Sequence, residues 1–296
     1  MIQGCPNYSC KFYQKSLMQK KDGFFYRRDD SRKIQRFQCS HCLKKYSSAL
    51  FTLEYRQKKR RMNRVIRNEL ASGISLRRCA RNLNLHRTTI ARKLDYLAKK
   101  ARLSHSAFLS SIQKESITHV QFDDLITSIH SKLKPLAISV VIDAKNRLIL
   151  GAKVSEIPAF GHLAKISRNK YGKRKNEHPE NLENLIKNLK PMISNRAVFR
   201  TDEHKRYPEI LKRHFQYAHH EAFTSKRASV AGLGELKTKK YDPLFMINHT
   251  LAMFRANINR LFRRTWCTTK SAEQLQNHVD VFIEYFNEMI LEKNNK

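Results

Sequence analysis

The chain has 296 residues, and its 59 Lys and Arg against 25 Asp and Glu give a formal net charge of +34 at pH 7. Hydrophobic residues make up 41% of the chain, which is enough to build a core and argues against wholesale disorder. A positive charge this large exceeds what solubility requires and favours a polyanionic partner. The sequence shows no apolar run near the length of a membrane span, no signal-peptide core and no lipidation motif. We therefore expect no membrane role and a cytoplasmic, nucleoid-associated location.

Two pairs of closely spaced cysteines stand near the start of the chain, in CPNYSC and FQCSHC. The pairs are Cys5 with Cys10 and Cys39 with Cys42. Short strands are predicted at 23–26 and 34–37, between the two pairs. Four thiolates satisfy tetrahedral Zn²⁺, which then replaces the core that so small a module lacks. We predict a structural zinc ribbon over residues 1–50, with His41 as an alternative ligand; four unrelated buried cysteines are the competing interpretation.

A basic segment with the periodicity of three short helices follows. The predicted helices cover 61–70, 75–83 and 86–98. Ser75 would cap the second helix, and the small Ala80 lies where two helices must cross closely. This pattern is typical of a helix-turn-helix DNA-binding domain, here over residues 56–103, whose third helix enters the major groove. The side chains expected to contact DNA are His86, Arg87, Thr88, Thr89, Arg92 and Lys93. A basic bundle that binds no DNA is the alternative, but the run of cations fits phosphate contacts.

From about residue 117 the pattern changes to strands alternating with helices. Strands are predicted at 117–125, 136–145, 147–156, 197–204 and 216–222, and helices at 178–190, 207–215 and 245–264. This order indicates an α/β domain with a mixed sheet over residues 115–296. In such sheets the functional side chains gather just beyond the strand ends.

Carboxylates are predicted at two of these strand ends. Asp123 or Asp124 would end the first strand, and Asp202 would end the fourth. Mg²⁺ or Mn²⁺ takes one or two carboxylates together with substrate phosphate oxygens, so the pattern indicates phosphoryl-transfer chemistry. Each aspartate taken alone is better explained as a cap or turn residue, and only their combination points to catalysis.

The combination of motifs resembles a known family. A cysteine-paired ribbon, a helix-turn-helix and the stretches VQFDDL and VFRTDEHKRYPEIL are similar to bacterial insertion-sequence transposases of the DDE type, in the zinc-ribbon group. The resemblance implies an RNase-H-like catalytic domain. It identifies Asp123 with the first catalytic aspartate and Asp202, followed by Tyr207, with the second.

The third catalytic position departs from the family pattern. It falls on Asn248 instead of glutamate, with Arg255 at the basic position seven residues later. An amide oxygen can ligate a hard cation but brings no charge, so metal affinity should fall. Some relatives resemble this chain in having asparagine there. Glu235 is a rival third ligand, and a surface amide without any metal role is the remaining interpretation of Asn248.

The resemblance implies a transposase that binds the terminal repeats of a mobile element. Asp123, Asp202 and Asn248 would hold catalytic Mg²⁺ or Mn²⁺ for cleavage and strand transfer, while Zn²⁺ is structural and Arg255 contacts phosphate. The partners would be double-stranded DNA, both element ends and target, and further copies of the chain, because two ends must be brought together. The alternative is a transposase-derived DNA-binding regulator that has lost catalysis, and Asn248 favours it. A repair nuclease is a third possibility, but it would not need the ribbon.

Overall fold

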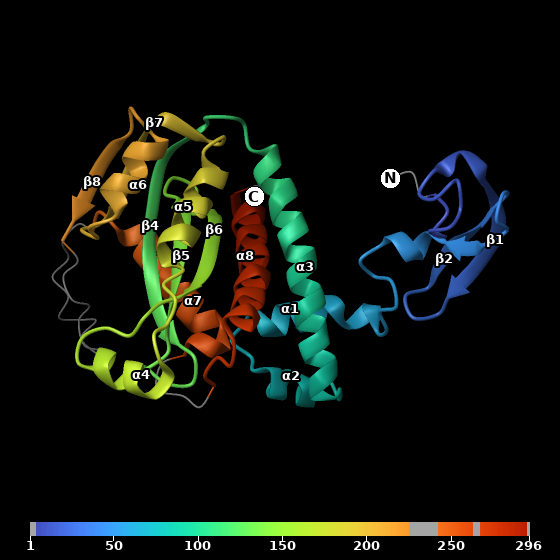
Figure 1. Cartoon of the computed structure of the whole chain (residues 1–296), viewed down its shortest axis with the longest axis horizontal. Coiled ribbons are helices and arrows are strands. Elements are labelled where there is room, and N and C mark those ends of the chain that lie inside the picture. Colours follow the sequence, from blue (N-terminus) through green and yellow to red (C-terminus); the bar gives the residue numbers. More distant parts are fainter. Residues whose placement is uncertain (1–3, 225–241, 263–266, 295–296) are drawn as a thin grey trace. The chain divides into compact units, whose positions relative to one another are not determined.

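The computed structural model describes residues 4–224, 242–262 and 267–294. The chain divides into two compact units, Met1–Ile66 and Arg67–Lys296 (Figure 1). The predicted helix-turn-helix segment from Arg67 onward therefore belongs to the same compact unit as the predicted α/β domain.

The first unit is built on a small antiparallel sheet. Strands β1 (Gln19–Arg27), β2 (Arg32–Cys39) and β3 (Lys45–Ser47) pair in the order β1-β2-β3. These strands include both segments predicted at 23–26 and 34–37. The core of this unit is small: Cys5, Cys10, Cys39 and Tyr46 are buried together, with Phe37 packed against them. A unit with so little apolar core needs another source of stability.

Three helices follow, α1 (Asn63–Leu70), α2 (Leu76–Asn82) and α3 (Arg87–Ser111). The predicted cap is present, because Ser75 Oγ accepts a hydrogen bond from Arg78 N at 3.2 Å. The third helix, however, does not end at residue 98 as the sequence predicted. Ala98 and Ala101 are fully buried, and α3 continues because this stretch packs against α8 (Ala272–Asn294).

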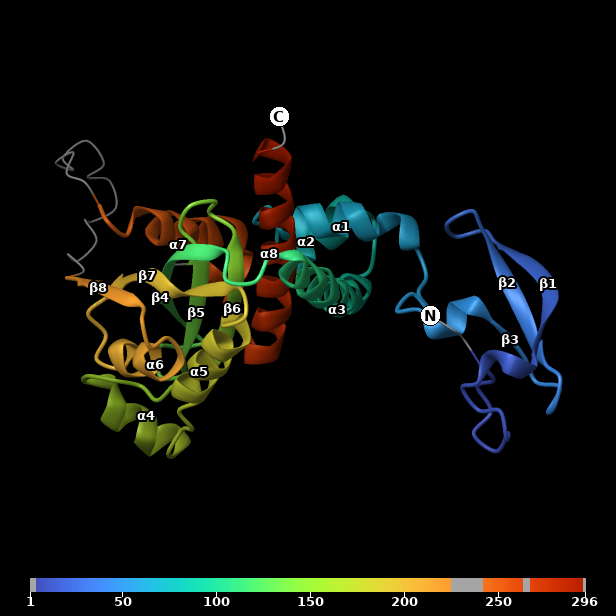
Figure 2. The same cartoon turned by 90° about the horizontal axis from the view of Figure 1, so that it is seen from above.

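A five-stranded sheet forms the centre of the second unit (Figures 1 and 2). Its strands are β4 (Ile117–Ser128), β5 (Pro135–Asp143), β6 (Ile149–Glu156), β7 (Ile193–Asp202) and β8 (His219–Phe223). Their order is β6-β5-β4-β7-β8, with β5 antiparallel to both its neighbours and β7 parallel to both of its own. The predicted mixed α/β architecture is confirmed. Every residue of β5 is buried, as expected for a Val- and Ile-rich strand covered on both faces.

Helices cover both faces of this sheet (Figure 2). On one face α5 (His178–Leu189) and α6 (Tyr207–His214) pack in a cluster that includes Phe122 and Phe199. On the other face α7 (Phe245–Asn257) and α8 share a cluster with Leu125. A further helix, α4 (Leu163–Tyr171), was not predicted.

The predicted helix 245–264 is shorter in the structure. It ends at Asn257, whose carbonyl accepts a hydrogen bond from Gly73 N at 2.7 Å, and Ile258 is extended. A short 3-10 turn, Asn259–Leu261, then brings Leu261 back into the core. A tertiary contact that the local sequence does not reveal therefore ends α7.

The first strand of the sheet is longer than predicted. β4 continues to Ser128, so Asp123 and Asp124 lie inside the strand, and the prediction that they end it was wrong. The strand continues because β5 pairs with it all the way to Ser128↔Pro135.

Among the described helices, none combines the length and apolar character that crossing a bilayer requires.

Candidate functional site

The sheet register brings Asp123 and Asp202 to neighbouring positions. The parallel pairing of β4 with β7 ends at Gln121↔Arg200. Asp123 and Asp202 each follow two residues later, so they lie side by side where the two strands part. Side chains two residues apart on a strand point to the same face, and both aspartates therefore share the face of Gln121 and Arg200. Asp202 is the last residue of β7, as predicted.

That face is the one covered by α7. The side chain of Gln121 donates to Pro243 O at 2.9 Å and accepts from Ile247 N at 3.0 Å, which attaches the start of α7 to β4. Leu125 packs in the same cluster as the α7 core residues. Asp123 lies between these two positions and so belongs to the same face, while Asp124 points toward α5 and α6.

Asp124 is held by three side-chain donors from three different elements. Ser139 Oγ donates to its Oδ1 at 2.6 Å, and His178 Nε2 and the Tyr207 hydroxyl donate to its Oδ2 at 2.7 and 2.8 Å. Burial opposes ionisation of this carboxyl, but the hydrogen bonds from His178, Ser139 and Tyr207 outweigh it and lower the pKa of Asp124. Asp124 is therefore an ionised carboxylate committed to joining β4 to α5 and α6.

Asp123 and Asp202 have the opposite character. Burial, together with the negative charges of Asp202 and Asp124, raises the pKa of Asp123 to about 7. Burial also raises the pKa of Asp202, with a further contribution from Asp124, against a hydrogen bond from His204 N. Three carboxylates crowded in a partly dry site repel one another. A divalent cation between Asp123 and Asp202 would offset this repulsion, and carboxylate oxygens are the ligands that such cations take.

The carboxylates open onto a hollow of about 720 Å³. Asp123, Asp124 and Asp202 line it together with His178 and, on the segment after β7, residues 203–207. Lys205 and Arg206 contribute positive charge to its wall and are both exposed. The hollow therefore combines carboxylate oxygens for a cation with cationic side chains for phosphate.

Arg255 is on α7, which covers the face of the sheet that carries Asp123. It is half-buried on α7 and its positive charge acts to lower the pKa of Asp123. It also lines a second hollow, of about 520 Å³, next to the first, with Ile126 and Phe160 lining both. The structure thus brings Arg255 into the electrostatic environment of Asp123.

Asn248 is placed differently. It is exposed on α7, and its Nδ2 donates to Asp242 Oδ2 at 3.0 Å. Asp242 in turn accepts from Leu244 N at 2.9 Å and so holds the start of α7. Among the described residues that line the carboxylate hollow, Asn248 does not appear. The rival ligand Glu235 lies outside the described residues.

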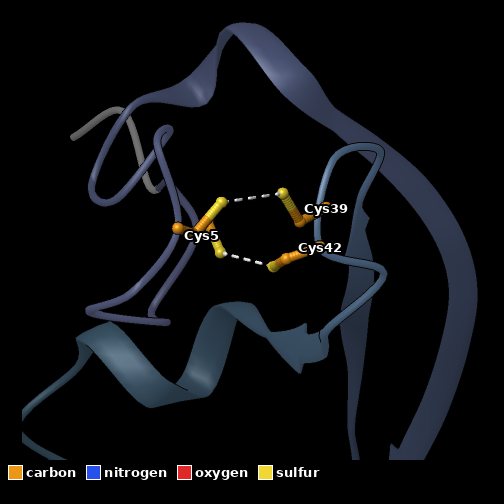
Figure 3. A group of neighbouring side chains, drawn as sticks. Cys5, Cys39 and Cys42 are labelled. Atoms are coloured by element: carbon orange, nitrogen blue, oxygen red, sulfur yellow. Dashed lines mark hydrogen bonds between the residues drawn. The ribbon is translucent and has the colours of Figure 1, made fainter.

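The four N-terminal cysteines meet in one cluster (Figure 3). Their sulfur atoms all lie within 4.8 Å of one another, and all four thiols are free. Cys5 Sγ lies 3.4 Å from Cys42 Sγ, and Cys10 Sγ lies 3.8 Å from Cys39 Sγ. Four thiolates around one Zn²⁺ at about 2.3 Å would be separated by about 3.8 Å. The cluster therefore has the donors and the spacing to bind a metal such as zinc.

The thiols of the cluster differ in their acid–base properties. Burial raises the pKa of Cys5, and its cysteine neighbours raise it further. The backbone N–H of Lys44 lowers the pKa of Cys42 to about 6. The alternative ligand His41 lies beside the cluster, with Nδ1 3.6 Å from Cys10 Sγ. Four thiols complete a tetrahedral set by themselves, so His41 is placed to contact the cluster from outside.

The residues predicted to contact DNA lie at the start of α3, and most of them are accessible. His86, Arg87, Thr88 and Arg92 are exposed and Thr89 is half-buried. His86 is also the cap of α3, because its Nδ1 accepts from Thr88 N at 3.3 Å. Lys93 is 5% exposed, with its ammonium 5.9 Å from the centre of the Tyr96 ring. Lys93 is thus buried, whereas the other five are exposed or half-buried.

Sequence reasoning missed His178 and Ser139 as partners of the site. A signal was present, because adjacent strand residues point to opposite faces, so the side chains of Asp123 and Asp124 leave β4 on different sides of the sheet. The partner of Asp124 then had to come from the helices on the other face. His178, next to Pro179 at the start of a predicted helix, was a candidate for that contact.

Comparison with known proteins adds no assignment. No family model matches the chain, and no curated protein matches its sequence.

Proposed function

We propose that this protein is a metal-dependent DNA transposase that cleaves and joins DNA strands at the ends of a mobile element. The observation that carries the proposal is that Asp123 and Asp202 lie close together just beyond the last β4–β7 pair, Gln121↔Arg200, with cationic side chains around them. Groups with strongly perturbed pKa values cluster at functional sites, and divalent cations act on phosphates in many of them.

The topology supports an RNase-H-like fold for the second unit. Numbered within that unit, the strands have the order 3-2-1-4-5, with the second antiparallel to its neighbours and the others parallel. The two aspartates lie on the first and fourth of these strands, which are adjacent in the sheet. The resemblance to DDE transposases implies this same placement.

The chain's own residues account for the required chemistry. Asp123 and Asp202 would hold Mg²⁺ or Mn²⁺, which supplies Lewis acidity for phosphoryl transfer. Asp124, fixed by His178 and Tyr207, positions the neighbouring Asp123 on β4. Lys205, Arg206 and Arg255 add positive charge where phosphate charge develops during strand cleavage.

The N-terminal part would supply DNA recognition. The cysteine cluster is proposed as a structural zinc ribbon, and α2 with α3 as a helix-turn-helix that reads the terminal repeat. Exposed Arg87 and Arg92 would contact bases or phosphates in the major groove. The formal charge of +34 suits a protein that binds two element ends and target DNA, and bringing two ends together implies a homo-oligomer on DNA.

A transposase-derived regulator without catalysis is the second candidate, and one observation favours it. The third catalytic position is Asn248, whose amide is engaged with Asp242 outside the carboxylate hollow. A protein that only binds DNA would have no use for a complete metal site. Asp123 and Asp202 favour the enzyme, because two half-buried carboxylates with raised pKa values are costly to a scaffold that does not use them.

The test is cleavage of the DNA that flanks the gene by purified protein in Mg²⁺ and in Mn²⁺. The enzyme predicts nicking at a repeat end that disappears in Asp202→Asn, while DNA binding by that variant is unchanged. Tight, salt-sensitive binding without cleavage in either metal would contradict the enzyme and support the regulator. An Asn248→Glu variant tests the third position: if Asn248 is a weak ligand, cleavage at low metal concentration should rise.

A further inference from the structure

One face of the first unit's sheet carries two exposed aromatic rings. Cross-strand partners lie on the same face of a sheet. The pairs on this face are Lys21 with Phe37, Phe24 with Gln35 and Tyr26 with Lys33. Near the cysteine cluster Phe37 is packed, whereas toward the β1–β2 turn Phe24 and Tyr26 are 61% and 58% exposed. Phe24 and Tyr26 thus lie open on one face; we call them, with Lys21 and Lys33, the aromatic face.

The opposite face of the same hairpin is partly covered. Phe25 pairs with Ile34, which is 8% exposed. On that side Arg27 is fixed by ion pairs with Asp30 and Glu54, and its side chain is 12% exposed. On the opposite face the Phe25 ring is 39% exposed, less than Phe24 and Tyr26, so the aromatic face is the more open of the two.

The charges around the aromatic face are positive. Every carboxylate between residues 4 and 66 takes part in an ion pair within this unit. The pairs are Asp22–Lys45, Asp29–Arg60, Asp30–Arg27 and Glu54–Arg27. Lys21 and Lys33, which flank the two rings, are both exposed and are not members of these pairs. The carboxylates of the unit are thus paired with Arg27, Lys45 and Arg60. Lys21 and Lys33 therefore leave the aromatic face with a positive charge that suits a polyanion.

We propose that the aromatic face binds single-stranded DNA, with Phe24 and Tyr26 stacking on unpaired bases and Lys21 and Lys33 contacting phosphates. Rings two residues apart on a strand are separated by about 6.7 Å, which allows each to take its own base. A duplex does not offer this contact, because its base faces already stack on one another. Stacking is independent of sequence, since every base has a π-face. The choice of DNA over RNA rests on the proposed function; the stacking contact does not.

The experiment measures binding of the full-length, zinc-loaded protein to three fluorescent probes by anisotropy. The probes are a 15-nucleotide oligothymidine, a 15-base-pair duplex of unrelated sequence and a 15-nucleotide oligouridine. Each stacked ring contributes about fivefold or more to affinity. The variant Phe24→Ala/Tyr26→Ala should therefore lose about 30-fold in affinity for oligothymidine and less than twofold for the duplex. Lys33→Ala should weaken binding of both DNA probes and reduce their salt dependence.

Two matched variants separate stacking from other effects. Phe24→Tyr/Tyr26→Phe keeps both rings and should bind oligothymidine as the wild type does. Phe24→Leu/Tyr26→Leu keeps apolar bulk without rings and should lose affinity as the alanine variant does. Equal binding of oligothymidine by wild type and alanine variant would overturn the proposal, as would equal losses on oligothymidine and duplex. Tighter binding of oligouridine than oligothymidine would overturn the choice of DNA. None of these measurements depends on strand cleavage, so an inactive protein would still give them.

Discussion

Replacing Tyr207 by Phe isolates one hydrogen bond at the carboxylate cluster. Tyr207 is 1% exposed, and its hydroxyl donates to Asp124 Oδ2 at 2.8 Å. Its ring lies 4.6 Å from the ring of Phe122 and 4.7 Å from that of His204, between centroids, and phenylalanine would keep both contacts without opening a cavity. A hydrogen bond to a charged acceptor contributes about 1.5–3 kcal/mol. Because two other donors still hold Asp124, we expect the free energy of unfolding to fall by about 2 kcal/mol.

Urea unfolding of the zinc-loaded protein, followed by far-UV circular dichroism at pH 7, measures this loss. Tyr217→Phe is the matched control, because Tyr217 is 66% exposed. The control should change the free energy of unfolding by less than about 0.5 kcal/mol, and both variants should keep the wild-type denaturant slope. If Tyr207→Phe is no less stable than Tyr217→Phe, Asp124 is not the ionised, fully bonded carboxylate described above.

Three further predictions concern the metal sites and the core. Removing zinc with a chelator should abolish the β-structure of residues 4–66, because the cysteine cluster is the core of this unit. Cys10→Ser should do the same. Retained β-structure in either case would contradict a structural metal. In the absence of divalent metal, urea unfolding should show that Asp202→Asn is more stable than wild type by up to about 1 kcal/mol, because the substitution removes charge repulsion between residues 202 and 123. A lower stability of Asp202→Asn would contradict that repulsion. Burial lowers the pKa of His278 from 6.5 to about 4, so the unfolded chain takes up the proton first and stability falls with pH below 6.5. Between pH 7 and pH 5 the wild type should lose about 2 kcal/mol more than His278→Gln in urea unfolding, and parallel curves would contradict the shift.

Periodicity and turn chemistry predicted most of the elements. The alternating strands, the Ser75 cap and the helix that begins beside Pro179 follow from local residue patterns, and all are present. The cysteine spacing likewise predicted a four-thiol cluster, because close pairs of cysteines separated by a hairpin can meet only at one point. These features depend on neighbours in sequence, which a single sequence displays.

The errors came from tertiary contacts. α3 continues past residue 98 because α8 packs against it. α7 ends at Asn257, whose carbonyl oxygen accepts a hydrogen bond from Gly73 N. The site shows the same limit. The sequence singled out Asp123 and Asp202 as candidates, but that they are neighbours depends on the register Gln121↔Arg200, which no local pattern specifies. That Lys93 is buried could likewise not be read from a basic run, because a long aliphatic stem packs as readily as it extends into solvent.

Asp123 and Asp202 together are proposed to hold a divalent cation. The most direct test is Mn²⁺ binding to zinc-loaded protein, measured by the loss of the free-ion signal in electron paramagnetic resonance. A chain of formal charge +34 repels cations in general, so bound Mn²⁺ would report a specific site. The account predicts Mn²⁺ binding by the wild type and by Glu292→Gln, an exposed carboxylate removed elsewhere on α8, and its loss in both Asp123→Asn and Asp202→Asn. Equal Mn²⁺ binding by all four proteins, or by none, would contradict it.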